Sequence, residues 1–96
     1  MPFGIRRTER AVAQMEELER SDPKRLKKVR KTLAFFGQNP RHPSLQTHAY
    51  DSIVGPNGKK VWEAYVENKT PSAFRVLWCY GPGDKEITVL SVTAHP

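Results

Sequence analysis

Apolar residues recur at helical spacing in two stretches of the first half of the chain. From Thr8, a residue type that caps helices, to Arg20, one face carries Val12, Met15 and Leu18. Asp22 and Pro23 then favour the start of a second helix, which we expect to end at Gly37. Its apolar stripe is formed by Leu26, Val29, Leu33 and Phe36. The pattern predicts a helical hairpin. A short strand precedes it, in which Phe3 and Ile5 alternate with Pro2 and Gly4 and which ends at Arg6 and Arg7.

The last third of the chain alternates with a period of two instead. This pattern predicts strands over residues 61–67, 73–80 and 86–92, joined by turns at residues 68–72 and 81–84. In the second strand Phe74, Val76, Trp78 and Tyr80 share one face, which leaves Arg75, Leu77 and Cys79 on the other. The order β-α-α-β-β-β predicts one α+β domain over residues 1–96, with the hairpin packed on a small, mainly antiparallel sheet.

Residues 38–60 show no clear periodicity and are rich in Pro, Gly, His and Asn. A loop this long in a small domain is usually functional or covers a sheet edge, and we expect Leu45, Ile53 and Val54 to attach it to the body. His42 and His48 lie six residues apart without a cysteine or acidic ligand nearby, which does not match a zinc pattern. The sequence therefore predicts no metal and no cofactor.

The net charge of +6 comes from one segment, because basic and acidic residues cancel elsewhere. Residues 21–41 hold seven basic side chains against Asp22 alone. Such a concentration predicts a surface that meets a polyanion, with RNA contacts from Lys24, Lys27, Lys28, Lys31 and Arg41. The alternative is that lysine and arginine are simply good helix formers at exposed positions. Since no apolar run approaches the ~20 residues of a membrane helix, we expect a cytoplasmic protein that does not contact a membrane.

Two residues of the last third are suited to chemistry on a phosphate. Arg75 stands on a partly apolar strand face, where its guanidinium needs an anion, and its planar fork fits phosphate oxygens. The alternative is an ion pair with Glu63 or Glu67 across the hairpin. His95 directly follows the last strand and has the side chain best suited to proton transfer near neutral pH.

The whole chain resembles the RelE/ParE superfamily of bacterial toxins. The likeness rests on the order of elements, on Trp62, on "AFRVLW" at 73–78 and on "ITVLSVTAHP" at 87–96. It implies that Arg75 binds the scissile phosphate, that His95 transfers a proton, and that Lys59 and Lys60 supply basic charge near the Trp-bearing strand. The sequence departs from the family's pattern directly after Trp62, where Glu63, Ala64 and Tyr65 stand in the places of the expected basic residues. A base before this strand is also missing, and His48, Glu63 and Tyr65 are the possible substitutes.

The resemblance implies a RelE-like endoribonuclease that cleaves mRNA on the ribosome and is neutralised by an antitoxin protein. Its partners would then be that antitoxin, mRNA and ribosomal RNA. A ParE-like toxin that inhibits a protein such as DNA gyrase is the second hypothesis, and a non-catalytic RNA-binding relative is the third. Arg75 together with His95 favours the nuclease, whereas the missing strand basics favour the other two.

Overall fold

The computed structural model describes residues 2–67 and 72–94 of the chain. Five strands form one sheet in the order β1-β5-β4-β3-β2, with β1 parallel to β5 and the other neighbours antiparallel. The elements are β1 (Gly4–Arg7), α1 (Glu9–Ser21), α2 (Pro23–Gln38), η1 (Pro43–Leu45), β2 (His48–Ala49), η2 (Pro56–Gly58), β3 (Trp62–Tyr65), β4 (Phe74–Tyr80) and β5 (Glu86–Ala94). The predicted α+β architecture is confirmed.

Both helices begin where the sequence placed their caps. The Thr8 hydroxyl accepts a hydrogen bond from the Ala11 amide at 3.1 Å, and the Asp22 carboxylate accepts one from Arg25 at 3.2 Å. At its other end α2 continues one residue past Gly37, to Gln38, because the Asn39 amide still donates to the Phe35 carbonyl at 2.8 Å. The prediction that Gly37 ends the helix was therefore short by one residue.

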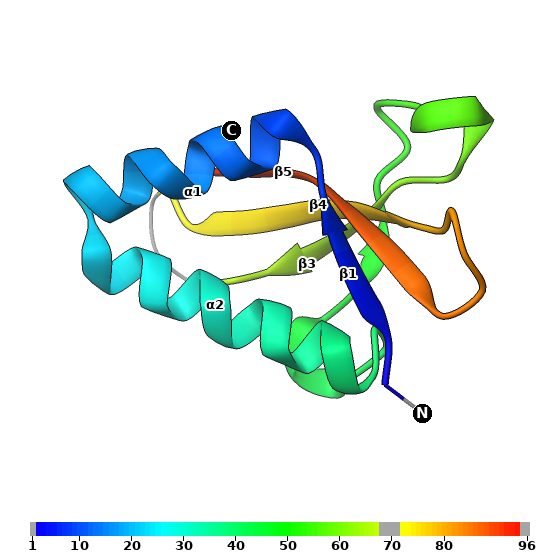
Figure 1. Ribbon diagram of the computed structural model, residues 1–96, viewed down its shortest axis with the longest axis horizontal. Helices are drawn as coiled ribbons and strands as arrows, with labels where there is room; N and C mark the ends of the chain where they lie inside the picture. The colour runs from blue at the N-terminus through cyan, green and yellow to red at the C-terminus, as the bar shows by residue number, and fades with distance from the viewer. Residues whose placement is uncertain (1, 68–71, 95–96) are drawn as a thin grey trace.

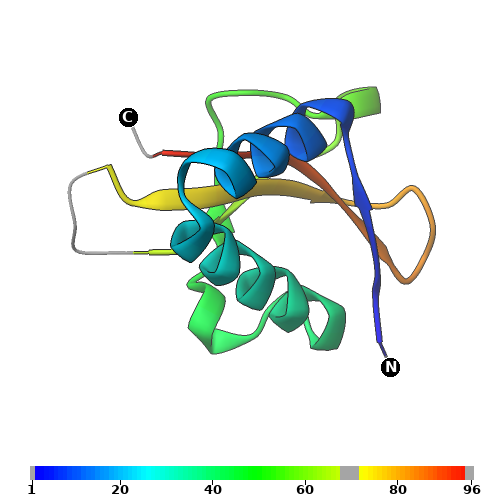
Figure 2. The ribbon, with the colours of Figure 1, turned by 60° about the vertical axis from the view of Figure 1, so that its left-hand side comes forward.

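The two helices cover one face of the sheet, as Figures 1 and 2 show from two directions. The stripes predicted on α1 and α2 pack onto Ala64, Val76, Trp78 and residues of β5. Val12 is the exception, because it lies at the exposed margin of its stripe. Since strand residues alternate between faces, Glu63, Arg75, Leu77 and Cys79 occupy the face away from the helices, which we call the outer face.

The loop before β3 contains a strand that the sequence did not reveal. β2 pairs with β3 through His48 opposite Glu63 and Ala49 opposite Trp62. Leu45 is buried, as predicted, but Ile53 and Val54 are 46% and 76% exposed, so the prediction that they attach the loop was wrong. The attachment is made instead by hydrogen bonds between backbone groups, from Tyr50 to Val61 and from Gly55 to Lys59. The predicted turn at residues 68–72 lies mostly outside the described residues.

Glu67, just after β3, ties α2 to the sheet. Its carboxylate accepts hydrogen bonds from Arg25 and Lys28 at 3.1 and 3.0 Å and from the Phe74 amide at 3.1 Å. Burial by itself would raise the pKa of Glu67, but the bonds from Lys28 and Phe74 and the charge of Arg25 outweigh it and lower the pKa. The ionised carboxylate therefore stabilises the fold.

We expect Glu67→Gln to lower the free energy of unfolding by about 1 kcal/mol at pH 7, because the amide cannot attract two cations. A lowered folded-state pKa contributes stability above the ordinary glutamate value of about 4.3, and that contribution disappears as the pH falls through the folded-state pKa. The difference between wild type and variant should therefore shrink between about pH 5 and pH 3 in urea unfolding curves. Glu17→Gln is the control, since Glu17 forms only an exposed pair with Arg20. A difference that stays constant with pH would contradict this account of Glu67.

Candidate functional site

A buried carboxylate lies at the centre of the outer face. Glu63 is 2% exposed, and its two oxygens contact two different partners. One oxygen, Oε2, accepts a hydrogen bond from Arg75 Nη1 at 2.5 Å. The other, Oε1, lies 2.5 Å from His48 Nε2. Because a buried carboxylate is costly unless it is paired, these contacts explain how Glu63 can stand where the family pattern places a basic residue.

Arg75 is held by Glu63, the ion pair that the sequence left open as an alternative to phosphate binding. It stands on β4, the middle strand, and is 5% exposed. Burial by itself would lower the pKa of Arg75, but hydrogen bonds to Glu63 and Tyr50 outweigh it and raise the pKa, so the guanidinium stays charged. Glu67, the other possible partner, is engaged by α2 instead. Within the described residues, Arg75 Nε has no hydrogen-bond partner.

His48 is the member of this group that solvent reaches, with 45% of its side chain exposed. Its position follows from strand register, because β2 places it directly opposite Glu63. The second ring nitrogen, Nδ1, lies 3.1 Å from the Gln46 carbonyl, a local contact at the exposed side of the ring. The Tyr65 ring lies at a centroid distance of 5.3 Å. All three possible substitutes for the missing base, His48, Glu63 and Tyr65, therefore meet at one place.

Tyr50 completes the group, and sequence reasoning did not select it. Its ring lies 4.7 Å from the Arg75 guanidinium carbon, and its hydroxyl is 3.5 Å from Nη2. The signal was available, since His48 and Tyr50 are two residues apart and such a spacing puts both side chains on one face of a strand. We call these five residues (His48, Tyr50, Glu63, Tyr65 and Arg75) the Glu63 cluster.

Lys59 and Lys60 point to different places. Lys60 Nζ lies 5.3 Å from the centre of the Trp62 ring, and the Arg41 guanidinium lies 5.5 Å from the same ring, so two predicted cations gather at Trp62. Lys59 instead approaches Gly81 and influences Cys79 at the far end of β4. Burial raises the pKa of the Cys79 thiol, partly offset by Lys59, so the buried Cys79 is an unreactive thiol.

The predicted basic face of α2 is present and mostly unpaired. Lys24, Lys27, Lys28 and Lys31 are all exposed. Lys28 binds Glu67, whereas the other three make no ion pair within the described part of the chain. Three unpaired lysines on one helix leave a local excess of positive charge that is available to an anionic partner.

His95 lies outside the described residues, so its predicted role stays a prediction. Thr93, two residues earlier in the sequence, is paired with Arg75 in the sheet. Among residues 2–67 and 72–94, no three His, Cys, Asp or Glu side chains are grouped so as to hold a metal ion. The helices of these same ranges include none that is long and apolar enough to cross a membrane.

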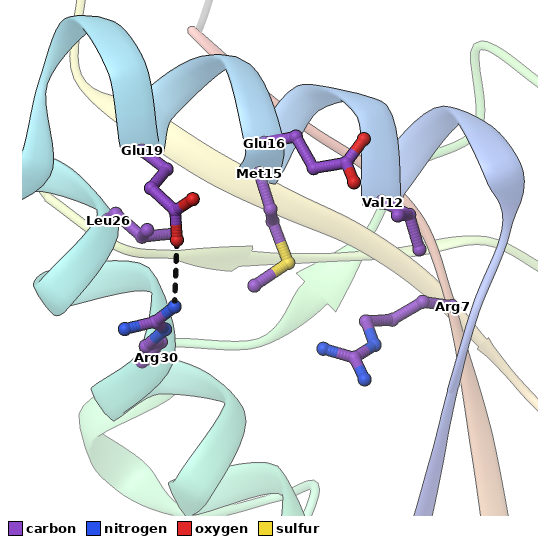
Figure 3. A pocket seen from close by; sticks show the side chains of 7 residues that line it. All are labelled: Arg7, Val12, Met15, Glu16, Glu19, Leu26 and Arg30. Atoms are coloured by element: carbon purple, nitrogen blue, oxygen red, sulfur yellow. Dashed lines mark ion pairs between the residues drawn. The ribbon is translucent and has the colours of Figure 1, made fainter.

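A hollow lies between α1, α2 and β1, away from the outer face of the sheet. Figure 3 shows its apolar floor of Val12, Met15 and Leu26, and the pair of Glu19 with Arg30, 3.7 Å apart, at one end. Arg7 and Glu16 lie toward the opposite end. No residue of the Glu63 cluster lines this hollow. It therefore offers a mixed apolar and charged surface that is separate from the Glu63 cluster.

The sequence matches no model of a protein family and no curated protein. Solved structures do match over nearly the whole chain. A YoeB dimer from Staphylococcus aureus covers all of both chains with a TM-score of 0.74 at 14% identity. A YoeB/ParE toxin from Agrobacterium tumefaciens covers 97% of this chain and 99% of its own, with a TM-score of 0.72 at 11% identity. The chain has the RelE/ParE toxin fold.

An archaeal RelE–RelB complex from Pyrococcus horikoshii OT3 shares the RelE/ParE fold as well. It covers 98% of this chain and 96% of its own, with a TM-score of 0.67 at 13% identity. The resemblance predicted from the order of elements is thus confirmed at the level of the fold. At 11–14% identity, the roles of individual residues have to be argued from the geometry of the Glu63 cluster.

Proposed function

We propose that this protein is the toxin of a toxin–antitoxin pair and an endoribonuclease that cleaves mRNA on the ribosome. The observation that carries the proposal is an exposed histidine, His48, held by a buried glutamate on the sheet of a RelE/ParE fold. The carboxylate at Nε2 fixes the orientation of the His48 ring and leaves Nδ1 as the nitrogen that can exchange a proton with a substrate, once Nδ1 gives up its contact with the Gln46 carbonyl. This is the arrangement expected of a general base or acid.

RNA cleavage without a metal needs three things. The ribose 2′-oxygen loses its proton and forms a bond to the adjacent phosphorus, while the bond from phosphorus to the 5′-oxygen breaks and that oxygen gains a proton. Cations or hydrogen-bond donors must also stabilise the charge on the phosphate oxygens in the transition state. We assign proton transfer to His48, with His95 as the predicted second group. Lys60 and Arg41 lie at the Trp62 ring, which packs with Trp78 on the helix side of the sheet, so we assign them to holding the RNA strand.

Glu63 and Arg75 are positioning residues in this proposal. Glu63 fixes the His48 ring, and Arg75 fixes Glu63 while balancing its charge. Because its guanidinium is buried and paired, Arg75 does not touch the substrate. It affects the reaction only through Glu63 and His48. Lys24 and Lys27 of α2, which form no ion pair among the described residues, supply charge for holding ribosomal RNA. An antitoxin is the proposed protein partner, in line with the RelE–RelB complex of similar fold.

The proposal is tested by inducing the protein in bacteria and mapping transcript ends by primer extension, with translation running and with translation blocked. We expect new ends that keep a constant position within codons and that disappear when translation is blocked, because the ribosome supplies the substrate's geometry. Co-expression of the product of an adjacent small reading frame should suppress them. Unchanged transcript ends in growth-arrested cells would contradict nuclease activity.

One observation favours the ParE-like alternative, a toxin that inhibits a protein target. The charge of Arg75, the arginine that strands β2 to β5 contain, is already neutralised by Glu63, so these strands offer no free arginine to a phosphate. In that case the Glu63 cluster is only structural, and the target meets another surface, such as the hollow of Figure 3. Relaxed plasmid DNA and intact transcripts after induction are the outcome that this alternative predicts.

A further inference from the structure

A groove begins beside the Glu63 cluster and runs between α2 and the edge of β3. Tyr65 lines it from the sheet, Ser44 and Leu45 line it from η1, and Lys28, Lys31 and Phe35 line it from α2. Its volume is about 260 Å³. We call it the α2 groove. Tyr65 lines the groove, and its ring lies 5.3 Å from the ring of His48, so the groove adjoins the proposed proton-transfer group.

The edge of β3 is open at this place. β2 pairs with β3 only at Trp62 and Glu63, so the edge is not covered by a neighbouring strand at Tyr65. Tyr65 is opposite Arg75 on the other side. β3 lies between β4 and β2 in the sheet, but β2 ends before Tyr65. Tyr65 therefore stands at an open edge, where a ligand can approach it.

The walls of the groove combine aromatic, apolar and cationic groups. Phe35 and Tyr65 contribute aromatic side chains, one face of the Phe35 ring being covered by His42, and Leu45 contributes a buried apolar side chain. Lys31, which makes no ion pair within residues 2–67 and 72–94, supplies a positive charge at the side of α2. Aromatic platforms beside unpaired cations are the combination by which proteins bind single-stranded nucleic acid without reading its sequence.

We propose that the α2 groove binds one nucleotide of single-stranded RNA next to the bond that is cut. The base stacks against Tyr65 and Phe35, and the phosphate meets Lys31. This inference rests on the proposed function, because it places the groove beside the reacting ribose. A volume of about 260 Å³ is below the ~300–1,000 Å³ of pockets for drug-sized ligands, so the groove encloses part of one nucleotide, such as its base, and no longer segment.

Binding is measured by fluorescence anisotropy with a labelled hexanucleotide that carries 2′-O-methyl groups and therefore cannot be cleaved. Lys31→Ala should weaken binding several-fold and reduce the slope of log affinity against log salt by about 0.7, the value for one lost phosphate contact on a single strand. Arg10→Ala is the charge-matched control, since Arg10 is exposed on α1 and does not line the groove. Equal affinities and slopes for the two variants would overturn the inference.

The proposed stacking of a base on Tyr65 is tested separately with Tyr65→Leu. We expect about tenfold weaker binding of the hexanucleotide, because stacking on one ring is lost. The variant should also bind an oligomer without bases as well as wild type does. If Tyr65→Leu weakens both oligomers equally, the base does not lie in the groove and the inference is wrong.

The two proposals fail separately, because the hexanucleotide reports on binding alone. If Lys31 and Tyr65 are needed to bind the hexanucleotide but transcripts stay intact, the groove proposal holds and the nuclease proposal is wrong. If mRNA is cleaved while Lys31→Ala and Tyr65→Leu bind like wild type, the nuclease proposal holds and the groove proposal is wrong. Amide signals of Lys31, Ser44 and Tyr65 in NMR titrations with the hexanucleotide locate the ligand directly, and unmoved signals would also overturn the inference.

Discussion

His48→Gln is expected to reduce the rate of RNA cleavage by about 10²–10⁴-fold, the usual contribution of a general acid or base. Glutamine keeps a hydrogen-bonding group near Glu63 but cannot exchange a proton near neutral pH. Because the His48 side chain is exposed and lies on the short strand β2, we expect the variant to fold. Cleavage of reporter mRNA on purified ribosomes measures the rate, and urea unfolding checks the fold.

His42→Gln is the matched control for this substitution. His42 lies in the same loop, accepts a hydrogen bond from the Ser44 amide at 3.1 Å and stacks on Phe35. It does not contact Glu63, so we expect its loss to change the cleavage rate only a few-fold. A His48→Gln protein that folds and still cleaves like the His42 variant would remove His48 from the mechanism and leave Glu63 and Arg75 as a purely structural pair.

Arg75→Met should have the largest effect on stability, lowering the free energy of unfolding by about 3–5 kcal/mol. The substitution removes the cation from a carboxylate that is 2% exposed, and an unpaired buried charge is far more costly than an absent pair. Since small domains are stable by only about 5–15 kcal/mol, the variant is expected to be close to unfolding at 37 °C. Urea unfolding at 25 °C measures the change.

The double variant Glu63→Leu with Arg75→Met keeps this prediction falsifiable even if the single variant does not fold. Removing both charges leaves an apolar pair of similar volume, so we expect it to recover most of the lost stability. It should nevertheless cleave RNA poorly, because nothing then holds the His48 ring. A single variant that loses less than about 1 kcal/mol, or a double variant that is less stable than the single one, would contradict the described balance of charges.

The fold was largely predictable because its main elements are coded by local patterns. The stripe from Leu26 to Phe36 and the caps at Thr8 and Asp22 act within a few residues of their own positions. β2 could not be predicted in the same way. Two residues, His48 and Ala49, show no periodicity, and they form a strand only because β3 offers a partner. The exposure of Ile53 and Val54 could not be predicted either. Hydrogen bonds between backbone groups hold that loop, and the pattern of side chains does not reveal them.

The sequence predicted which residues form the site better than it predicted which groups they contact. Sequence reasoning selected Arg75, Glu63, His48 and Tyr65, but it had no means to decide whether Arg75 faces a phosphate or a carboxylate. Both are anions, and the choice depends on which one lies within hydrogen-bond distance. Tyr50 was missed although its spacing of two residues from His48 was a signal, because residues 38–60 gave no sign that His48 begins a strand.

The sequence by itself determined the order of elements, the two apolar faces of the hairpin, the excess charge on α2 and the set of titratable side chains on the last strands. Each of these depends on neighbours a few residues away, where spacing and geometry are fixed. Only the tertiary structure decided that Glu63 joins Arg75 to His48, that Lys59 and Lys60 diverge, and that Tyr65 lies between the cluster and the α2 groove. These depend on strand register, and a shift of one residue would move every side chain to the other face.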